Sequence, residues 1–317
     1  MELSRRQVLR ALAAAGLLAV VSACSSPFAR TRLTVATGGT QGVYFKLGTA
    51  LARIWQDRLG LDDQPQVLDT AGSVANLGLL ASGNADVAFS QVDVAADQLT
   101  GAAGPHTIRA LARIYDDAVH VVVAASSPIR TLVDLRGARV SVGAKDSGVT
   151  VIARRLLDVA GLSPDTDLQP AQLGINDSVT AMREGRIDAF FWVGGLPTAG
   201  VSELATTTPI RLLDLDDLVS AVRGRFPAYA SGMVLARTYD IPEPITTLLV
   251  RNVLLVTAAM PDDLARALVD ALFAGQEGLA QASIAALTID PRSAIGTQPV
   301  PLHPGAAQFY RAAKKTG

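Results

Sequence analysis

Short apolar runs and amphipathic helical patterns alternate along most of the chain. The run Leu33 to Ala36 is followed by a loop of small residues, after which apolar side chains recur at helical spacing. These side chains are Tyr44, Leu47, Leu51, Ile54, Trp55 and Leu59. Strand signals at Gln66 to Leu68 and Asp86 to Phe89 are followed in the same way. The alternation predicts an α/β protein in which helices pack on a parallel sheet.

Each of these strands ends in a turn of small, hydroxylated or amide residues. The first turn, Gly38-Gly39-Thr40-Gln41-Gly42, leads into a helix whose N-terminus favours an anion, and its glycines let the backbone approach a ligand. Ser73 is placed to cap the helix after the second strand, and Ser90 and Gln91 open the third turn. Because the carboxyl ends of parallel strands meet at one edge of a sheet, we expect the three turns to lie side by side at a binding edge.

The middle of the chain repeats this order of elements. A strand at Arg139 to Val142 leads into the turn Gly143 to Thr150 and an amphipathic helix, and a strand at Ile187 to Trp192 ends in another turn of small residues. Two α/β lobes with facing turns predict a cleft that closes on a small molecule. We assign residues 33–125 and 225–317 to lobe 1 and residues 126–224 to lobe 2.

The last part of the chain is expected to be mainly helical. After a strand signal at Tyr229 to Ala236, helices are predicted at Pro242 to Ala259, Asp262 to Glu277 and His303 to Lys315. The apolar stretch Ile245 to Met260 falls short of the roughly 20 residues that span a bilayer, so we interpret it as a buried helix.

The N-terminus predicts export and lipid anchoring. Arg5-Arg6 forms a twin-arginine pattern, and the run Ala11 to Val21 has the length of a signal-peptide core. The four residues ending at Cys24, the only cysteine, resemble a lipobox with a lipidated cysteine. We expect a Tat-type lipoprotein signal peptide at residues 1–23, an anchor linker at residues 24–32 and a location on the outer face of the cytoplasmic membrane. The alternative is a stray cysteine in an ordinary signal sequence.

Charge and residue chemistry favour a binding protein over an enzyme. The formal net charge of -1 provides no basic field for nucleic acid. The three histidines have no partners at metal-ligand spacing, so we expect neither a metal nor a cofactor; they are His106, His120 and His303. Ser73 and Ser147 lack a recognisable base and are interpreted as helix caps or ligand donors. Three acidic pairs are interpreted as residues of turns or helix starts: Asp62-Asp63, Asp116-Asp117 and Asp262-Asp263.

Five segments carry motifs of a known family. Thr37 to Phe45 reads TGGTQGVYF, Thr70 to Leu77 reads TAGSVANL and Ser82 to Asp93 reads SGNADVAFSQVD. Ile187 to Pro197 and Pro301 to Ala306 add two further segments. In this order they resemble the TAXI family of extracytoplasmic solute receptors, which serve tripartite ATP-independent periplasmic (TRAP) transporters. The resemblance covers nearly the whole mature chain.

The resemblance implies a type II periplasmic-binding-protein fold, with two Rossmann-like lobes around a ligand cleft. It also implies capture of a small organic anion, such as a glutamate- or glutamine-like amino acid or another carboxylate, and partnership with the membrane subunits of a TRAP permease. The positions that it carries over as ligand contacts are Thr40, Tyr44, Ser73, Ser90, Gln91, Ser147, Gly148, Trp192, Gly194 and Pro197. We expect Thr40 and Tyr44 to touch the ligand most directly.

The chain departs from the family pattern at Lys46, Val149, Thr198 and the segment Phe226 to Tyr229. These departures leave the identity of the ligand open. Thr150 would supply the hydroxyl absent at Val149 if the turn is shifted. Two other functions are weighed: a sensory receptor that reports to a membrane histidine kinase, and an enzyme on the same fold, for which Lys145 and Asp146 are the charged residues in the lobe 2 turn.

Overall fold

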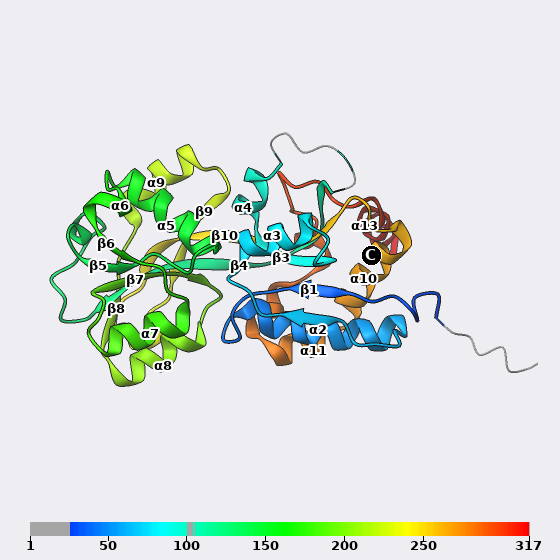
Figure 1. Cartoon of the computed structure of the whole chain (residues 1–317), viewed down its shortest axis with the longest axis horizontal. Helices are drawn as coiled ribbons and strands as arrows, with labels where there is room; N and C mark the ends of the chain where they lie inside the picture. The colour runs from blue at the N-terminus through cyan, green and yellow to red at the C-terminus, as the bar shows by residue number, and fades with distance from the viewer. Residues whose placement is uncertain (1–25, 100–103, 105, 317) are drawn as a thin grey trace, which may run out of the picture.

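A ten-stranded sheet passes through both halves of the part of the chain that the structure describes. The computed structural model describes residues 26–99, 104 and 106–316. The strands follow the order β2-β1-β3-β10-β4-β7-β5-β6, with β8 paired to β4 and β9 to β10. Helices cover both faces of the sheet in its left and right halves (Figure 1). The predicted α/β class is confirmed.

The first half of the sheet is built from a β-α-β-α-β unit. Its elements are β1 (Thr34–Ala36), α2 (Val43–Leu59), β2 (Gln66–Leu68), α3 (Ser73–Ala81), β3 (Val87–Gln91) and the short α4 (Val92–Asp97). Strand β1 lies between β2 and β3 and is parallel to both. The three turns after these strands therefore lie at the same edge of the sheet, as the sequence predicts.

The second half repeats this unit. Its elements are β5 (Arg139–Ser141), α5 (Gly148–Val159), α6 (Pro164–Asp167), β6 (Gln169–Ala171), α7 (Ile175–Arg183) and β7 (Ala189–Gly194). Strand β5 lies between β6 and β7 and is parallel to both. Around this unit lie η1 (Val133–Leu135), α8 (Ala199–Thr207), β8 (Ile210–Leu212), α9 (Asp216–Arg225), β9 (Tyr229–Val234) and η2 (Thr238–Asp240).

Two long antiparallel strands join the halves. Strand β4 (Ile108–Ala124) pairs with β10 (Ile245–Thr257) over its first part and with β7 over its last part. Strand β10 pairs with β9 through residues 245–250 and with β3 through residues 252–255. The division into lobes at residues 125 and 225 stays a prediction. The pairing of β9 with β10 affects where the second of these boundaries, at residue 225, would lie.

The helix predicted at Pro242 to Ala259 is wrong, because this segment forms β10. The strand is covered by other strands on both edges and is buried along most of its length, including Leu248, Val250 and Val253. A strand that is buried on both faces has a continuous apolar run, which periodicity alone does not separate from a buried helix.

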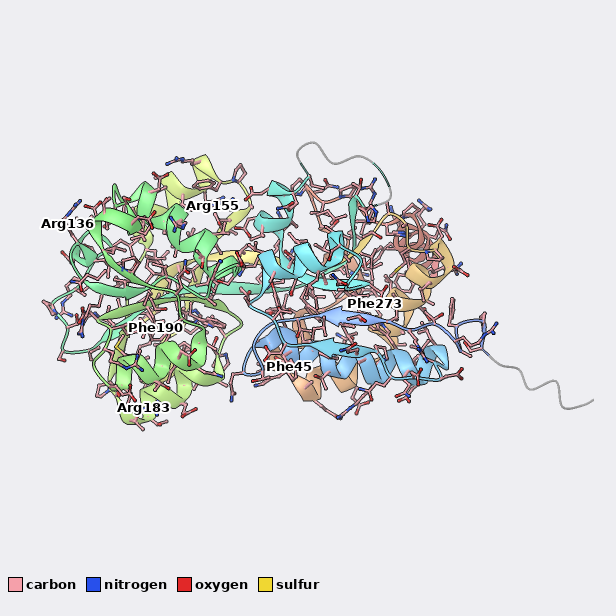
Figure 2. All side chains as sticks on the ribbon, viewed as in Figure 1. Phe45, Arg136, Arg155, Arg183, Phe190 and Phe273 are labelled. Atoms are coloured by element: carbon pink, nitrogen blue, oxygen red, sulfur yellow. The ribbon has the colours of Figure 1, made fainter. Side chains whose placement is uncertain are left out.

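Helices after β10 complete the first half. They are α10 (Asp262–Ala274), α11 (Gln276–Ala282), η3 (Ile284–Thr288), α12 (Pro291–Ala294) and α13 (Pro304–Thr316). Trp55 of α2 is fully buried against α10 and donates a hydrogen bond from Nε1 to the Leu268 carbonyl at 3.1 Å. In the second half Phe190 of β7 is equally buried, under α7 and α8 (Figure 2).

An ion-pair cluster links the two halves. Arg155 of α5 donates to Asp93 and Asp97 of α4, each at 2.7 Å, and to the Tyr229 hydroxyl at 2.9 Å. Its guanidinium lies 4.8 Å from the centre of the Phe226 ring. Because the Asp93 side chain is almost fully buried, this cluster fixes how the halves pack.

The predicted signal peptide at residues 1–23 and the lipidation site Cys24 lie outside the described residues. The described part of the anchor linker is attached to the first half, since the Asp62 backbone N–H donates to the Ala29 carbonyl at 2.7 Å. In the part of the chain that the structure describes, none of the helices combines the length and the apolar character needed to cross a bilayer.

Candidate ligand pocket

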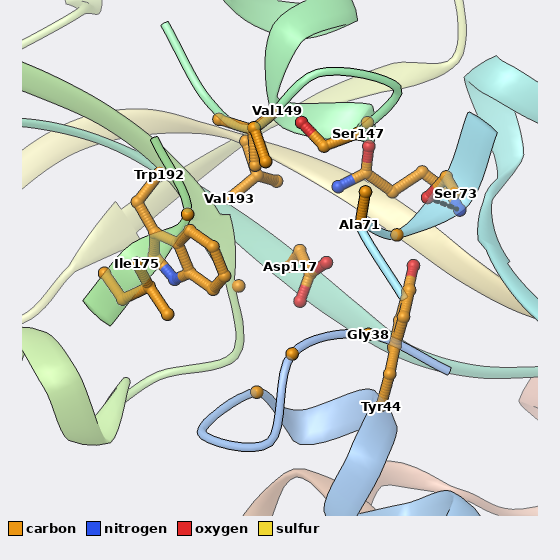
Figure 3. A pocket seen from close by; sticks show the side chains of 18 of the residues that line it. Gly38, Tyr44, Ala71, Ser73, Asp117, Ser147, Val149, Ile175, Trp192 and Val193 are labelled. Carbon is orange, nitrogen blue, oxygen red and sulfur yellow. Dashed lines mark hydrogen bonds between the residues drawn. The ribbon is translucent and has the colours of Figure 1, made fainter. Parts of the chain in front are cut away.

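A pocket lies between the two halves, at the edge where the turns of both units meet (Figure 3). Its volume of about 120 Å³ is roughly ten times the space that one water needs. This is enough for a small metabolite. The lining residues are Gly38, Gly39, Gly42, Val43, Tyr44, Thr70, Ala71, Gly72, Ser73, Gln91, Tyr115, Asp117, Ala144, Ser147, Gly148, Val149, Gly174, Ile175, Trp192, Val193 and Gly194.

Four helices begin at the pocket. The first residues of α2, α3, α5 and α7 are Val43, Ser73, Gly148 and Ile175, and all four line it. The first N–H groups of a helix have no partner within the helix, and they carry the positive end of its dipole. The pocket is therefore surrounded by backbone groups that favour a negatively charged ligand group.

The two halves touch beside the pocket. The Ala75 backbone N–H of α3 donates to the Asp146 carbonyl in the turn before α5 at 3.0 Å. A β-carbon added to Gly195 would lie 3.1 Å from Val43, so this glycine brings the turn after β7 against the start of α2. These contacts bring the turns of both units together around one cavity.

Asp117 lies on the floor of the pocket, where β4 passes from one half to the other (Figure 3). The residue is only 2% exposed. Burial raises the pKa of its carboxyl group to about 7, and the polar side chains of Asn252, Gln91 and Tyr115 nearby oppose this rise only in part. Its Oδ1 atom is buried without a hydrogen-bond partner. Asp117 is thus a carboxyl group that titrates near neutral pH inside the pocket.

Two tyrosines form the wall next to this carboxyl group. The Tyr44 hydroxyl donates to Asn252 Oδ1, and the Tyr44 ring packs 5.2 Å from Phe89 and edge-on to Tyr115 at 6.3 Å. Burial raises the pKa of both tyrosines well above its usual value. Both phenols are therefore neutral and can donate hydrogen bonds. The predicted Tyr44 lines the pocket, whereas sequence reasoning missed Tyr115.

The predicted residues of the second and third turns are brought together. The Ser73 hydroxyl accepts a hydrogen bond from the Gln91 backbone N–H at 3.1 Å, and both residues line the pocket. The predicted capping role of Ser73 is wrong, because Gly72 precedes α3 without any side-chain cap and Ser73 is already helical. Ser90 is buried, donates to the Gln91 carbonyl at 3.0 Å and does not line the pocket.

The turn before α5 has the local structure that its sequence favours. Ser147 caps the helix by accepting from the Thr150 backbone N–H at 3.2 Å, as predicted. Gly143 has a φ of 94°, and a β-carbon there would lie 2.6 Å from that of Val149. The pocket is lined by Ser147, Gly148 and Val149. Thr150 does not line it, and its hydroxyl donates to the Ala144 carbonyl at 2.7 Å.

Trp192 and Gly194 also reach the pocket. The Trp192 indole donates to Thr198 Oγ1 at 3.0 Å. A β-carbon on Gly194 would lie 2.5 Å from the Nε1 atom of Trp192. Pro197 is exposed and lines a separate surface groove. Thr40 is exposed and is not among the lining residues. The charged turn residues Lys145 and Asp146 are exposed as well and lie outside the lining.

The interpretation of Asp116-Asp117 as a turn or helix start is wrong. Both residues lie inside β4, which runs without interruption from Ile108 to Ala124. Two β-rich runs, Ile108 to Tyr115 and Ala118 to Ala125, are separated by only these two residues, with neither Gly nor Pro between them. Two β-rich runs without a turn residue between them indicate one continuous strand, with a buried acid inside it.

Known proteins share this fold. Residues 35–313 match the model of the NMT1-like family. A structure from Bordetella bronchiseptica RB50 has 22% identity and a TM-score of 0.54, covering 89% of each chain. One described as a periplasmic transporter has 14% identity and a TM-score of 0.52, covering 90% of this chain and 93% of the other. A putative L-cystine ABC transporter from Listeria monocytogenes has 14% identity and a TM-score of 0.50, covering 81% of this chain and 95% of the other. Together with the sheet topology, they confirm the predicted periplasmic-binding-protein fold.

Proposed function

This chain belongs to the NMT1-like family, and from its fold and pocket we propose that it is an extracytoplasmic solute receptor. The receptor captures a small organic anion, such as a glutamate- or glutamine-like amino acid or another carboxylate. It delivers this solute to a TRAP-type secondary transporter, as the resemblance to TAXI receptors implies.

One observation carries the proposal: four helix N-termini from both halves converge on a single small pocket. Ser73 and Gly148, the first residues of α3 and α5, come from opposite halves and both line it. A carboxylate bound there would accept hydrogen bonds from backbone N–H groups of both halves at once. Binding would then hold the halves together, which is the mechanical requirement of a receptor whose closed form is recognised by a membrane partner.

The pocket chemistry favours binding over catalysis. Among its lining residues, all within the described chain, there is no histidine, cysteine or lysine to act as a base or nucleophile. The Ser147 hydroxyl is used as a helix cap. His120 is fully buried and shares a hydrogen bond with the Tyr239 hydroxyl at 3.0 Å, and burial lowers its pKa to about 4. We therefore propose a receptor and not an enzyme.

The proposed location follows from the N-terminal sequence. A lipid on Cys24 would anchor the receptor at the outer face of the cytoplasmic membrane, with residues 24–32 as the linker. Cell fractionation tests this part, because Cys24→Ser should move the protein from the membrane fraction to the soluble fraction. An unchanged membrane association would contradict lipid anchoring.

The receptor function is tested by a thermal-shift screen of the purified full-length protein against amino acids and carboxylates. A ligand at 100 times its Kd stabilises the folded state by about 2.7 kcal/mol, which raises the Tm by roughly 5 °C or more. We expect such a shift with one small group of related compounds. No shift with any of them would overturn the proposed function.

A further inference from the structure

The pocket contains one carboxyl group and no basic side chain. Asp117 is the single Asp or Glu among the lining residues, and none of these described residues is Lys, Arg or His. A ligand that is only an anion would thus meet a carboxylate without any protein cation beside it. The side-chain charge of this pocket therefore does not fit a simple carboxylate alone.

The arginines beside Asp116 in the sheet are already engaged. Arg113 pairs with Asp116 at 2.7 Å on the neighbouring position of β4. Arg251, opposite Asp116 in the register of β10, donates to the Gly296 carbonyl at 3.1 Å. Neither of these arginines lines the pocket. The charge of Asp117 is left to be balanced by a molecule that enters the pocket.

The orientation of Asp117 supports a bound molecule as the partner of its carboxyl group. Figure 3 shows its carboxyl group between Tyr44 and Trp192, with Ser147 on the opposite side of the pocket. The residue is 2% exposed, and its Oδ1 atom has no hydrogen-bond partner. An acceptor that is buried without a donor is costly, so a donor is expected to reach it in the functional state.

The helix N-termini require the opposite charge. The starts of α3 and α5 present backbone N–H groups at Ser73 and Gly148, and these favour an anionic group. One cavity thus offers an anion-binding side made of backbone and a cation-binding side made of one carboxylate. A molecule with separated positive and negative charges satisfies both.

We propose that Asp117 is the specificity residue of this receptor and that it binds a protonated nitrogen of the solute, while the helix N-termini hold the carboxylate of the same molecule. This inference rests on the proposed receptor function and narrows it. The solute is a zwitterion such as an α-amino acid, and carboxylates without an amine are rejected. The rejection arises because a ligand without an amine would leave the Asp117 carboxylate unpaired.

A different role for the same residue is a protonated Asp117 that donates a hydrogen bond to an oxygen of an anionic solute. The two roles differ in which compounds bind and in how affinity depends on pH. A protonated Asp117 favours carboxylates without an amine, and their affinity falls as pH rises. An ionised Asp117 favours amines, and their affinity rises with pH.

The test is titration calorimetry of the full-length protein with matched pairs of compounds. Each amino acid is compared with the acid that lacks only the amine, for example L-glutamate with glutarate and L-leucine with 4-methylpentanoate. For any amino acid that binds, we expect the amine-free partner to bind at least about 100-fold more weakly. Asp117→Asn should weaken amino-acid binding at least about tenfold and strengthen binding of the amine-free partner, because the carboxylate that excludes this partner is gone.

Asp116→Asn is the matched control, since Asp116 is the preceding residue of the same strand but pairs with Arg113 outside the pocket. It should leave the affinity of amino acids unchanged. If amine-free acids bind as tightly as amino acids, the inference is wrong and the receptor function stands. If no compound of either kind binds, both fail. Should Asp117→Asn not fold, the matched pairs on the wild-type protein still decide between these outcomes.

Discussion

The Gln91 side chain occupies the place that a β-carbon on Gly148 would take. Gln91 Oε1 lies 2.0 Å and Gln91 Cδ 2.7 Å from that position, and Ser73 Oγ lies 3.0 Å from it. Gln91 ends β3 in the first half, and Gly148 begins α5 in the second. The two halves thus meet through a contact that only glycine permits, directly at the pocket.

Gly148→Ala should therefore impair binding more than folding. The added methyl group would displace the Gln91 amide from the pocket wall or hold the halves apart. We expect the affinity for the solute to fall at least about tenfold, measured by titration calorimetry. Gly78→Ala in α3 is the control, because no atom lies within 4 Å of the new β-carbon. It should bind normally and gain up to about 1 kcal/mol in stability. Tight binding by Gly148→Ala would refute this role of the contact.

Arg155 should contribute to stability through its contacts between the halves. Replacing Arg155 by Met leaves the buried Asp93 carboxylate without its cation and removes the contact with Phe226. Breaking one side of such a buried pair typically costs about 3 kcal/mol or more. Arg154→Met is the control, because Arg154 pairs with Asp165 at an exposed position. Chemical denaturation measures both variants, and equal stabilities would contradict the structural role of Arg155.

Asp117 should make stability depend on pH. Its pKa is raised by burial to about 7, while Tyr44, Tyr115 and Asp116 are the titratable groups around it. The folded state holds the proton more tightly than the unfolded state, so this group destabilises the fold progressively from about pH 4 to pH 7 and by a constant amount above that. Asp117→Asn removes this loss, which is on the order of a few kcal/mol at most.

Thermal unfolding of the ligand-free protein checks this sign. The Tm of Asp117→Asn should equal that of the wild type near pH 4 and exceed it above about pH 7. A wild-type protein that gains stability over the variant as pH rises would show that folding lowers the pKa of Asp117 below its unfolded value. The pKa assignment would then be wrong.

Single variants of Tyr44 and Thr40 test separately the two residues of the opening turn that were predicted to touch the ligand. Tyr44 lines the pocket and donates to the buried Asn252, so Tyr44→Phe should weaken solute binding by about fivefold to tenfold. Thr40 is exposed and outside the lining residues, so Thr40→Val tests whether a bound solute extends to that position. Calorimetry of the two single variants decides, and unchanged affinity in both would reject the predicted role of this turn.

The binding edge could be predicted because its signals are local. Small residues follow β1, β2 and β3 directly, and parallel pairing places the ends of these strands together. The resemblance to TAXI receptors, and not the turn pattern, placed Trp192 and Gly194 at the cleft. The turn pattern gave the binding edge and the interpretation of Ser147 as a helix cap or a ligand donor. These features depend on turn chemistry within a few residues, which the sequence states directly.

The missed features depend on long-range packing. Asp117 is buried only because β4 runs between β10 and β7, and β10 was predicted as a helix since its apolar run is continuous. Ile175 joins the site through the start of α7, which follows β6 at the same edge as the turn after β5. The contact of Gln91 with Gly148 arises from how the halves dock, which no local pattern encodes.

The most direct test of the receptor function is mass spectrometry of the small molecule that the protein retains. The full-length wild type and Gly148→Ala are each incubated with a small-molecule extract of bacterial cells, washed and denatured, and the released compounds are identified. We predict that the wild type releases one compound carrying both a carboxylate and an amine, and that Gly148→Ala releases at least about tenfold less. No retained compound, or equal release from both proteins, would contradict a solute receptor that closes on its ligand at this pocket.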